Sequence, residues 1–253
     1  MGLNFNQKHH SLLYQPIASY MKKISLALLY FLGFTSVFFL QSCGGDDDPD
    51  PASAFSNGYF VLNEGNFGSG NGNISFIGEE DTLERAFQTA NSLPLGDVVQ
   101  DLAIIDNETY IVVNNDSKIE VADLTEDMLS VATITPLDLP RRIIRVSDST
   151  AYVSNWGKFD GSVPAYIAIV DLQAKAISDT ITTGAFLGSD RMAIAGNQVY
   201  IANNFSNTLT VINADTDEIV ETISVGDAPA SMVVEGNSLW VLCSGSYGAD
   251  FGT

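Results

Sequence analysis

Residues 189–226 read SDRMAIAGNQVYIANNFSNTLTVINADTDEIVETISVG, and the pattern within them recurs along the chain. Apolar residues alternate with small or polar ones in short runs such as Val199–Ala202 and Thr208–Asn213. Asn, Asp or Gly bounds each run. A period of two between turn residues is typical of β-strands. The stretch therefore predicts four short strands joined by turns.

The same unit occurs in other parts of the chain with a step of eight residues between two anchor positions. The pairs of anchors are Leu102 and Tyr110, Ile144 and Tyr152, Met192 and Tyr200, and Met232 and Trp240. Turn residues lie between the anchors of every pair: Asp106-Asn107, Asp148-Ser149, Gly196-Asn197 and Gly236-Asn237. Four short strands repeated about every 40–50 residues are typical of propeller blades. The predicted fold is an all-β propeller of four-stranded antiparallel blades.

The repeats predict an incomplete ring. The first copy begins at Asn57-Gly58-Tyr59-Phe60, already at its second strand, and the chain stops at Thr253 inside a loop. An open array leaves two sheet edges exposed, and exposed edges are prone to unwanted pairing. We therefore expect residues 57–253 to form about four blades and part of a fifth, as a piece of a longer propeller.

The amino-terminal part has a different composition. Residues 1–42 contain no Asp or Glu, and Met21-Lys22-Lys23 precede the apolar run Ile24–Leu40. A basic start and an apolar centre are typical of a secretory signal. A transmembrane anchor is the alternative, because the run is nearly long enough to span a bilayer. We expect residues 1–20 to be an upstream extension and residues 21–42 to be a signal peptide.

The residues that follow this run indicate lipidation. Leu40-Gln41-Ser42-Cys43 resembles the lipobox of bacterial lipoproteins, in which the Cys receives the lipid. Residues 43–56 are rich in Asp and Pro, so we expect an extended, solvated tether. An acidic run after the lipidated Cys also resembles the surface-export signal of lipoproteins in the Bacteroides group. The resemblance implies an outer-membrane lipoprotein exposed at the cell surface, with a periplasmic location as the alternative.

Charge and histidine content limit the function. The part from Cys43 onward has eight Lys and Arg against 31 Asp and Glu, a net charge of −23, which argues against nucleic-acid binding. No histidine follows His10, which removes His-based catalytic triads and His metal ligands. We expect a non-enzymatic protein with no cofactor or metal. Calcium in the Asp- and Asn-rich loops is the alternative.

The connections between the second and third predicted strands differ in length. The step is nine residues from Tyr110 to Ile119 and from Tyr200 to Leu209. It is fourteen residues from Phe60 to Ile74 and fifteen from Tyr152 to Ile167. In a blade of four antiparallel strands these connections all lie on one face. The sequence therefore predicts that the long loops share a face.

The long loops supply most of the candidate ligand-binding residues, because binding residues concentrate on loops held by a rigid scaffold. These residues are Asn66, Phe67, Trp156, Lys158, Phe159, Asp160, Tyr247 and Phe251. Aromatic rings beside hydrogen-bonding groups suit a flat or partly apolar ligand, a sugar ring or a protein partner. The alternative is that the rings fold back and fill their own loops.

Arg142 and Arg191 occupy the same position in two copies, just before the first-strand anchor. We expect both to lie near the central channel on the loop-bearing face, where two Arg side chains can bind a carboxylate or phosphate. Salt bridges to Asp101 or Asp190 are the alternative.

Several segments resemble a known family. Pro229–Met232 with Leu239–Val241, and Val199–Asn204 with Thr208–Asn213, are similar to the repeats of YncE-like seven-bladed propellers. Asn57–Phe76 resembles the opening of surface lipoprotein propellers of the Bacteroides group. One branch of these, the BtuG-like proteins, captures corrinoids such as cobalamin for an outer-membrane transporter. The resemblance implies a surface binding module for a small ligand with a transporter as partner. A scaffold or adhesion propeller that binds protein or glycan is the alternative.

Overall fold

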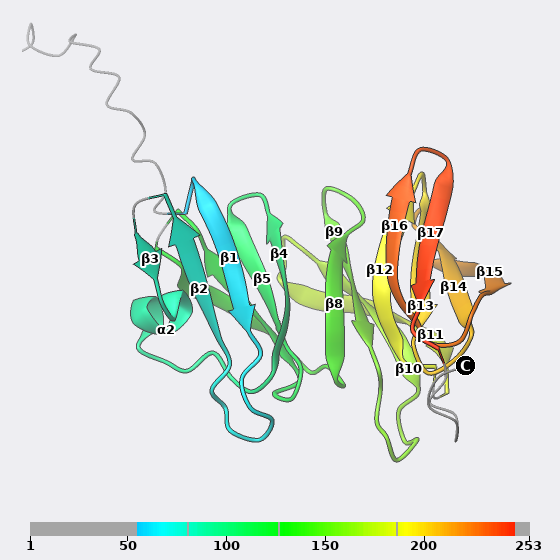
Figure 1. The fold of residues 1–253 in the computed structure, drawn as a ribbon, viewed down its shortest axis with the longest axis horizontal. Coiled ribbons are helices and arrows are strands. Elements are labelled where there is room, and N and C mark those ends of the chain that lie inside the picture. The colour runs from blue at the N-terminus through cyan, green and yellow to red at the C-terminus, as the bar shows by residue number, and fades with distance from the viewer. Residues whose placement is uncertain (1–54, 80, 126, 186, 246–253) are drawn as a thin grey trace, which may run out of the picture. The chain divides into compact units, whose positions relative to one another are not determined.

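The computed structural model describes residues 55–79, 81–125, 127–185 and 187–245 (Figure 1). The chain divides into two units, Met1–Pro51 and Ala52–Thr253, and the described ranges belong to the second. The predicted signal peptide, Cys43, most of the predicted tether, Tyr247 and Phe251 lie outside them. Within the described ranges, no helix has the length and apolar character needed to cross a membrane.

The described residues form five antiparallel sheets, each made of strands that follow one another in the sequence. The first sheet has three strands, the next three have four each, and the last has two. The first sheet contains β1 (Gly58–Asn63), β2 (Asn73–Gly78) and β3 (Thr82–Leu83), and a short helix, α2 (Ala86–Asn91), follows it. The second contains β4 (Val99–Ile105), β5 (Glu108–Val113), β6 (Lys118–Asp123) and β7 (Leu129–Ile134).

The third sheet contains β8 (Pro140–Arg145), β9 (Thr150–Asn155), β10 (Ala165–Asp171) and β11 (Ala176–Gly184). The fourth contains β12 (Ser189–Ala195), β13 (Gln198–Asn203), β14 (Thr208–Asn213) and β15 (Glu218–Ser224). The last contains β16 (Pro229–Glu235) and β17 (Ser238–Cys243). These sheets confirm the prediction of an all-β propeller with an incomplete ring.

Buried side chains fill the spaces between consecutive sheets. Strand β5 shows the arrangement, because Tyr110 and Val112 pack in a cluster with the third sheet while Ile111 and Val113 pack in a cluster with the first. The middle strands are thus buried on both faces. This burial accounts for the continuous apolar run at residues 110–113, which lacks the alternation of a half-exposed strand.

The connections between second and third strands lie at the same end of the sheets as the links between sheets. Figure 1 shows the β1–β2 and β9–β10 loops at its lower end, opposite the β8–β9 and β16–β17 turns. Backbone amides in these loops donate hydrogen bonds to carbonyl groups of the links: Asn114 to Val98, Trp156 to Leu139, and Phe205 to Leu187. The long loops at residues 64–72 and 156–164 therefore share one face, as predicted.

The first turn of the third sheet differs from its equivalents. In the other copies the anchor on the second strand pairs with the residue that follows the anchor on the first strand. The pairs are Tyr110 with Ala103, Tyr200 with Ala193, and Trp240 with Val233. Tyr152 instead pairs with Ile144, and the amide of Val146 closes a longer turn by donating to the carbonyl of Thr150 (2.9 Å). Ile143, and not Ile144 as the eight-residue step predicted, is therefore the structural equivalent of Leu102 and Met192.

One hydrogen-bonding arrangement occurs in two sheets with different surroundings. Asn63 Nδ2 donates to Asn73 Oδ1 (2.9 Å) and Ser75 Oγ (3.4 Å) in the first sheet. Asn203 Nδ2 donates to the hydroxyl groups of Thr208 and Thr210 (both 3.0 Å) at the equivalent place in the fourth. Asn203 is fully buried and lies beside β12, which covers that edge of β13, whereas Asn63 is exposed because β1 is the edge of its sheet.

Tyrosines on second and third strands link the sheets. Tyr110 Oη donates to the carbonyl of Leu172 (3.5 Å), and Tyr152 Oη donates to the carboxylate of Asp217. Tyr166 Oη accepts from the amide of Asp138 (3.1 Å). Burial raises the pKa of all three phenols, with nearby carboxylates adding to the effect.

Candidate functional site

The inner strands β4, β8, β12 and β16 begin in the same way. A residue with positive φ precedes each strand: Val98, Leu139, Gly188 and Ala228. A register shift follows, which is a β-bulge that re-aims side chains at the loop-bearing end. Six residues at these bulges in the second, third and fourth sheets form what we call the inner-strand cluster: Gln100, Asp101, Arg141, Arg142, Asp190 and Arg191.

Arg141 connects the three sheets of this cluster. Its Nη1 donates to Gln100 Oε1 (2.5 Å), and its Nε donates to Asp190 Oδ2 (3.1 Å). Its guanidinium carbon lies 3.9 Å from the ring centre of Trp156, which is a cation–π contact. Burial lowers the pKa of Arg141, and the negative charge of Asp190 opposes this effect. The side chain therefore holds Trp156 in place.

Arg142 is also engaged within the cluster. Its Nη1 donates to the carbonyl of Gln100 (2.6 Å) and lies 3.4 Å from Asp101 Oδ1, and its Nε lies 3.4 Å from Asp190 Oδ1. For Arg142 the structure thus contains the salt bridges that were the alternative to ligand binding. The predicted equivalence of Arg142 and Arg191 agrees with the bulge positions, but Arg191 is exposed and forms no ion pair among the described residues.

The long loop of the third sheet, residues 156–164, carries an aromatic cluster. Trp156 is partly buried, and its ring centre lies 6.1 Å from that of Phe159 and 4.7 Å from that of Phe205 in the fourth sheet. The exposed fractions of Phe159 and Phe205 are 68% and 49%. Phe159 is therefore accessible to a ligand, whereas the partly buried Trp156 packs against both Phe159 and Phe205.

Two other predicted residues of this loop have partners nearby. Lys158 is exposed, and its Nζ lies 3.6 Å from Asp138 Oδ1. The carboxylate of Asp160 accepts hydrogen bonds from the hydroxyl (2.6 Å) and amide (2.9 Å) of Ser162. These bonds, the hydroxyl first, lower the pKa of Asp160. Asp160 thus shapes its own loop.

The long loop of the first sheet, residues 64–72, presents Phe67 on its surface with an exposed fraction of 80%. The amide of Asn66 donates to Asn71 Oδ1 (2.8 Å) within the loop. Asp97, in the link before β4, accepts from the amides of Gly68 (2.8 Å) and Gly70 (3.4 Å) and from Asn115 Nδ2 (2.6 Å). Burial alone raises the pKa of Asp97, but these hydrogen bonds together lower it below its ordinary value.

The structure brings some predicted residues together and separates others. Trp156, Lys158 and Phe159 lie on one loop that joins the inner-strand cluster through Arg141. Asn66 and Phe67 belong to the first sheet, and the second sheet with its short loop at residues 114–117 lies between the two long loops. The described candidate residues therefore fall into two groups, one at the third and fourth sheets and the other, with Asn66 and Phe67, on the loop of the first sheet.

Hollows surround the loop at residues 156–164. One of about 520 Å³ lies beside the third sheet and is lined by Asp138, Pro164, Tyr166, Ile177 and other residues. Another of about 380 Å³ is lined by Asp138 together with Lys158, Phe159 and Asp160. Asp138 borders both hollows, whereas Phe159 lines only the second, so a ligand on Phe159 has open space beside Lys158 and Asp160.

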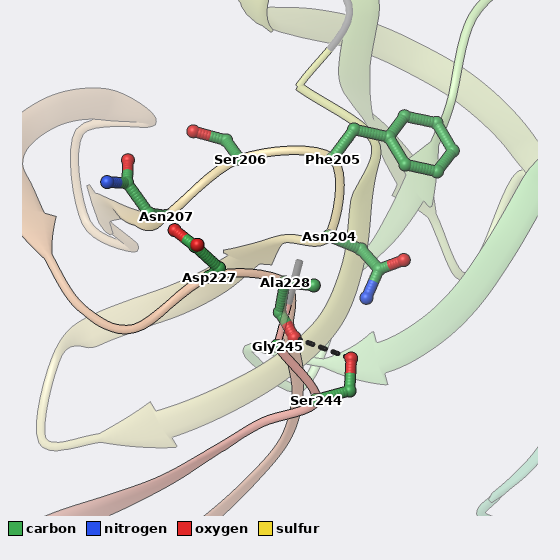
Figure 2. A pocket seen from close by; sticks show the side chains of 8 residues that line it. All are labelled: Asn204, Phe205, Ser206, Asn207, Asp227, Ala228, Ser244 and Gly245. Carbon is green, nitrogen blue, oxygen red and sulfur yellow. Dashed lines mark hydrogen bonds between the residues drawn. The ribbon is translucent and has the colours of Figure 1, made fainter. Parts of the chain in front are cut away.

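A larger hollow of about 730 Å³ lies next to Phe205 between the fourth and last sheets (Figure 2). Its wall consists of Asn204–Asn207 together with Asp227, Ala228, Ser244 and Gly245. Ser244 Oγ donates to the carbonyl of Ala228 (3.1 Å), and Asn204 Nδ2 donates to that of Pro229 (3.2 Å). Phe205 thus borders both the aromatic cluster and this hollow.

Sequence reasoning did not select Arg141, Phe205 or Asp138. Phe205 had one available signal, since it is the aromatic residue of the otherwise polar stretch Asn203–Asn207. Arg141 is next to Arg142 in the sequence, but the β-bulge that places both side chains in the cluster follows from the pairing of β8 with β9. Within the described ranges, His, Cys, Asp and Glu side chains form no group of three that could hold a metal ion.

Repeated four-stranded sheets with variable loops at one end define a β-propeller protein with an incomplete ring. Residues 57–246 match the family described as "Domain of unknown function (DUF5074)", and the chain belongs to this family. A search of curated protein sequences found no significant match.

Solved structures of similar shape agree on the fold. Hydrazine synthase of Kuenenia stuttgartiensis is 15% identical, with a TM-score of 0.54 over 71% of this chain and 49% of that chain. BamB of Moraxella catarrhalis is 9% identical, with a TM-score of 0.52 over 74% of this chain and 53% of that chain. The chain thus spans about half the length of these structures. At such identities the likeness shows the fold alone.

Proposed function

We propose that this propeller is a non-enzymatic binding module that captures a small, partly flat ligand on its loop-bearing face. The observation that carries the proposal is the exposed ring of Phe159, which packs against Trp156 and lines a hollow of about 380 Å³, while Trp156 also packs against Phe205. Binding sites combine apolar rings with a few oriented polar groups, and here Lys158 and Asp138 supply the polar groups. The absence of histidine after His10 favours binding over catalysis.

The leading ligand is a corrinoid such as cobalamin, handed on to an outer-membrane transporter. Support for this choice comes from the resemblance of Asn57–Phe76 and the repeats to BtuG-like surface propellers. A corrinoid presents a broad, partly apolar ring, which suits an exposed aromatic side chain beside open space. A sugar ring also stacks on aromatic side chains, so a glycan is the outcome to test against it.

Calorimetry with cobalamin tests the ligand directly. We expect the protein to bind cobalamin, and Phe159→Ala to weaken binding by about 1–3 kcal/mol because an anchor ring is removed. Tyr59→Ala is the matched control, because Tyr59 is 78% exposed but lies at the start of β1, away from the long loops. Absence of heat at micromolar cobalamin excludes the corrinoid. Heat with a glycan that depends on Phe159 then assigns the same face to carbohydrate.

We further propose that lipid on Cys43 anchors the protein in the outer membrane with the propeller at the cell surface. The lipobox-like Leu40–Cys43 and the acidic run after it support this placement. Cys43→Ala should release the protein from the membrane fraction, and protease added to intact cells should cleave the wild-type protein. Membrane retention of the Cys43→Ala variant would show that Ile24–Leu40 is a transmembrane anchor instead.

A further inference from the structure

The inner-strand cluster carries a surplus of positive charge. Its three Arg residues face two Asp residues, whereas the chain from Cys43 onward has eight Lys and Arg against 31 Asp and Glu. A local excess of positive charge in a strongly negative domain marks the place where an anion meets the least repulsion. The cluster lies at the loop-bearing end of the inner strands, beside Trp156.

Two of the three Arg side chains are already neutralised. Arg141 is paired with Asp190 and packed on Trp156, and Arg142 is shared between Asp101 and Asp190. Both guanidinium groups are largely buried, so a ligand reaches neither without breaking an existing pair. Their role is to join the sheets.

Arg191 is in a different position. It is exposed, and no ion pair with it forms among the described residues. Its charge still acts on the cluster, because burial raises the pKa of Asp101 while Arg142 and then Arg191 oppose that effect. Ser231, which is half-buried, occupies the equivalent bulge position on the neighbouring inner strand β16. Its hydroxyl group is a hydrogen-bond donor.

We propose that Arg191, together with the hydroxyl of Ser231, binds an oxyanion group of the ligand, either a phosphate or a carboxylate. A guanidinium with free N–H donors matches both groups through paired hydrogen bonds. The inference rests on the proposed function, since it names the charged part of a ligand whose ring lies on Phe159. It also assigns different roles to the two Arg residues predicted from the sequence: Arg142 joins the sheets, and Arg191 contacts the ligand.

Titration calorimetry with inorganic phosphate at low ionic strength tests the inference without the unknown ligand. We expect the wild-type protein to bind phosphate, Arg191→Gln to bind it at least about tenfold more weakly, and Arg191→Lys to lie between them. Arg85→Gln is the matched control, because Arg85 is also exposed but precedes α2 in the first sheet's link. It should bind phosphate as the wild type does.

A parallel titration with acetate separates the two sources of the oxyanion. Stronger binding of phosphate assigns a phosphate group, and equal or stronger binding of acetate assigns a carboxylate. The inference is overturned if the wild type binds neither anion, or if Arg191→Gln binds both as well as the wild type does. Phosphate binding that requires Arg191 without any cobalamin binding removes the corrinoid and leaves the oxyanion site in place. If Arg191→Gln binds cobalamin as tightly as the wild type does, the corrinoid is retained and Arg191 is removed as a contact of the ligand.

Discussion

The carboxylate of Asp97 accepts hydrogen bonds from the backbone amides of Gly68 and Gly70 and so stabilises the conformation of the first long loop. Asp97→Asn replaces one acceptor oxygen with a donor group, so we expect faster hydrogen exchange at Gly68. The lowered pKa of Asp97 means that its contribution is present above the unfolded value of about 3.9 and is lost as pH falls through the folded value.

The measurement is the amide resonance of Gly68, followed by NMR as the pH falls from about 6 to about 2 around the reference pKa. It should shift in the wild type and stay nearly constant in Asp97→Asn. Asp160→Asn serves as the control, since Asp160 closes the other long loop and should leave Gly68 unchanged. An unchanged titration in Asp97→Asn would show that another group holds the loop.

Arg141 links three sheets through one side chain. Arg141→Ala removes two hydrogen bonds to charged or polar partners and the contact with Trp156, so we expect a loss of about 1–3 kcal/mol in the free energy of unfolding. Urea denaturation followed by tryptophan fluorescence measures it. Arg85→Ala, at an exposed position, should stay within about 0.5 kcal/mol of the wild type. Equal effects of the two substitutions would contradict the linking role.

At the scale of elements, the long loop 156–164 can be exchanged without loss of the strands that carry it, although the exchange also removes the contact between Trp156 and Arg141. Replacing it with the short loop Asn204–Asn207 should preserve the β-sheet circular dichroism spectrum, because loop length has a small effect on closure entropy. Cobalamin binding should be lost with Phe159. The matched control replaces the short loop 114–117 with the same segment and should retain binding. Retained binding in the first chimera would place the site elsewhere.

The sequence allowed the strands and the loop lengths to be predicted, because both follow from local patterns. Tyr110 and the turn at residues 106–107, for example, lie within one hairpin. Side-chain partners could not be predicted in this way. Arg141 meets Gln100 in one neighbouring sheet and Asp190 in the other, and such pairs depend on how the sheets pack. The same limit explains why Phe205 was missed, since its contact with Trp156 crosses from one sheet to the next.

At the scale of the whole molecule, the buried tyrosines predict instability in alkaline solution. The pKa of Tyr110, Tyr152 and Tyr166 is raised by burial. A raised folded pKa gives stability that is fully present below the unfolded value of about 10 and is lost as pH rises above it. Thermal unfolding should therefore occur at lower temperature as pH increases beyond about 10. Tyr152→Phe should reduce this dependence, and an unchanged melting temperature in the wild type would contradict it.

Asn63 and Asn203 form equivalent hydrogen bonds in two sheets, one exposed to water and one buried. Comparison of the two shows how water affects the contribution of a side-chain hydrogen bond to stability. Both amides donate to two side-chain oxygens on the adjacent strand, Asn63 at an exposed sheet edge and Asn203 at a buried position beside β12. After Asn63→Ala, water can replace the lost donor. After Asn203→Ala, the half-buried Thr208 and the fully buried Thr210 lose their donor, and water cannot reach Thr210 to replace it, so unfolding should become about 1–3 kcal/mol more favourable than in Asn63→Ala. Urea denaturation of both variants would therefore measure, within one protein, how much of a hydrogen bond's contribution comes from solvent exclusion.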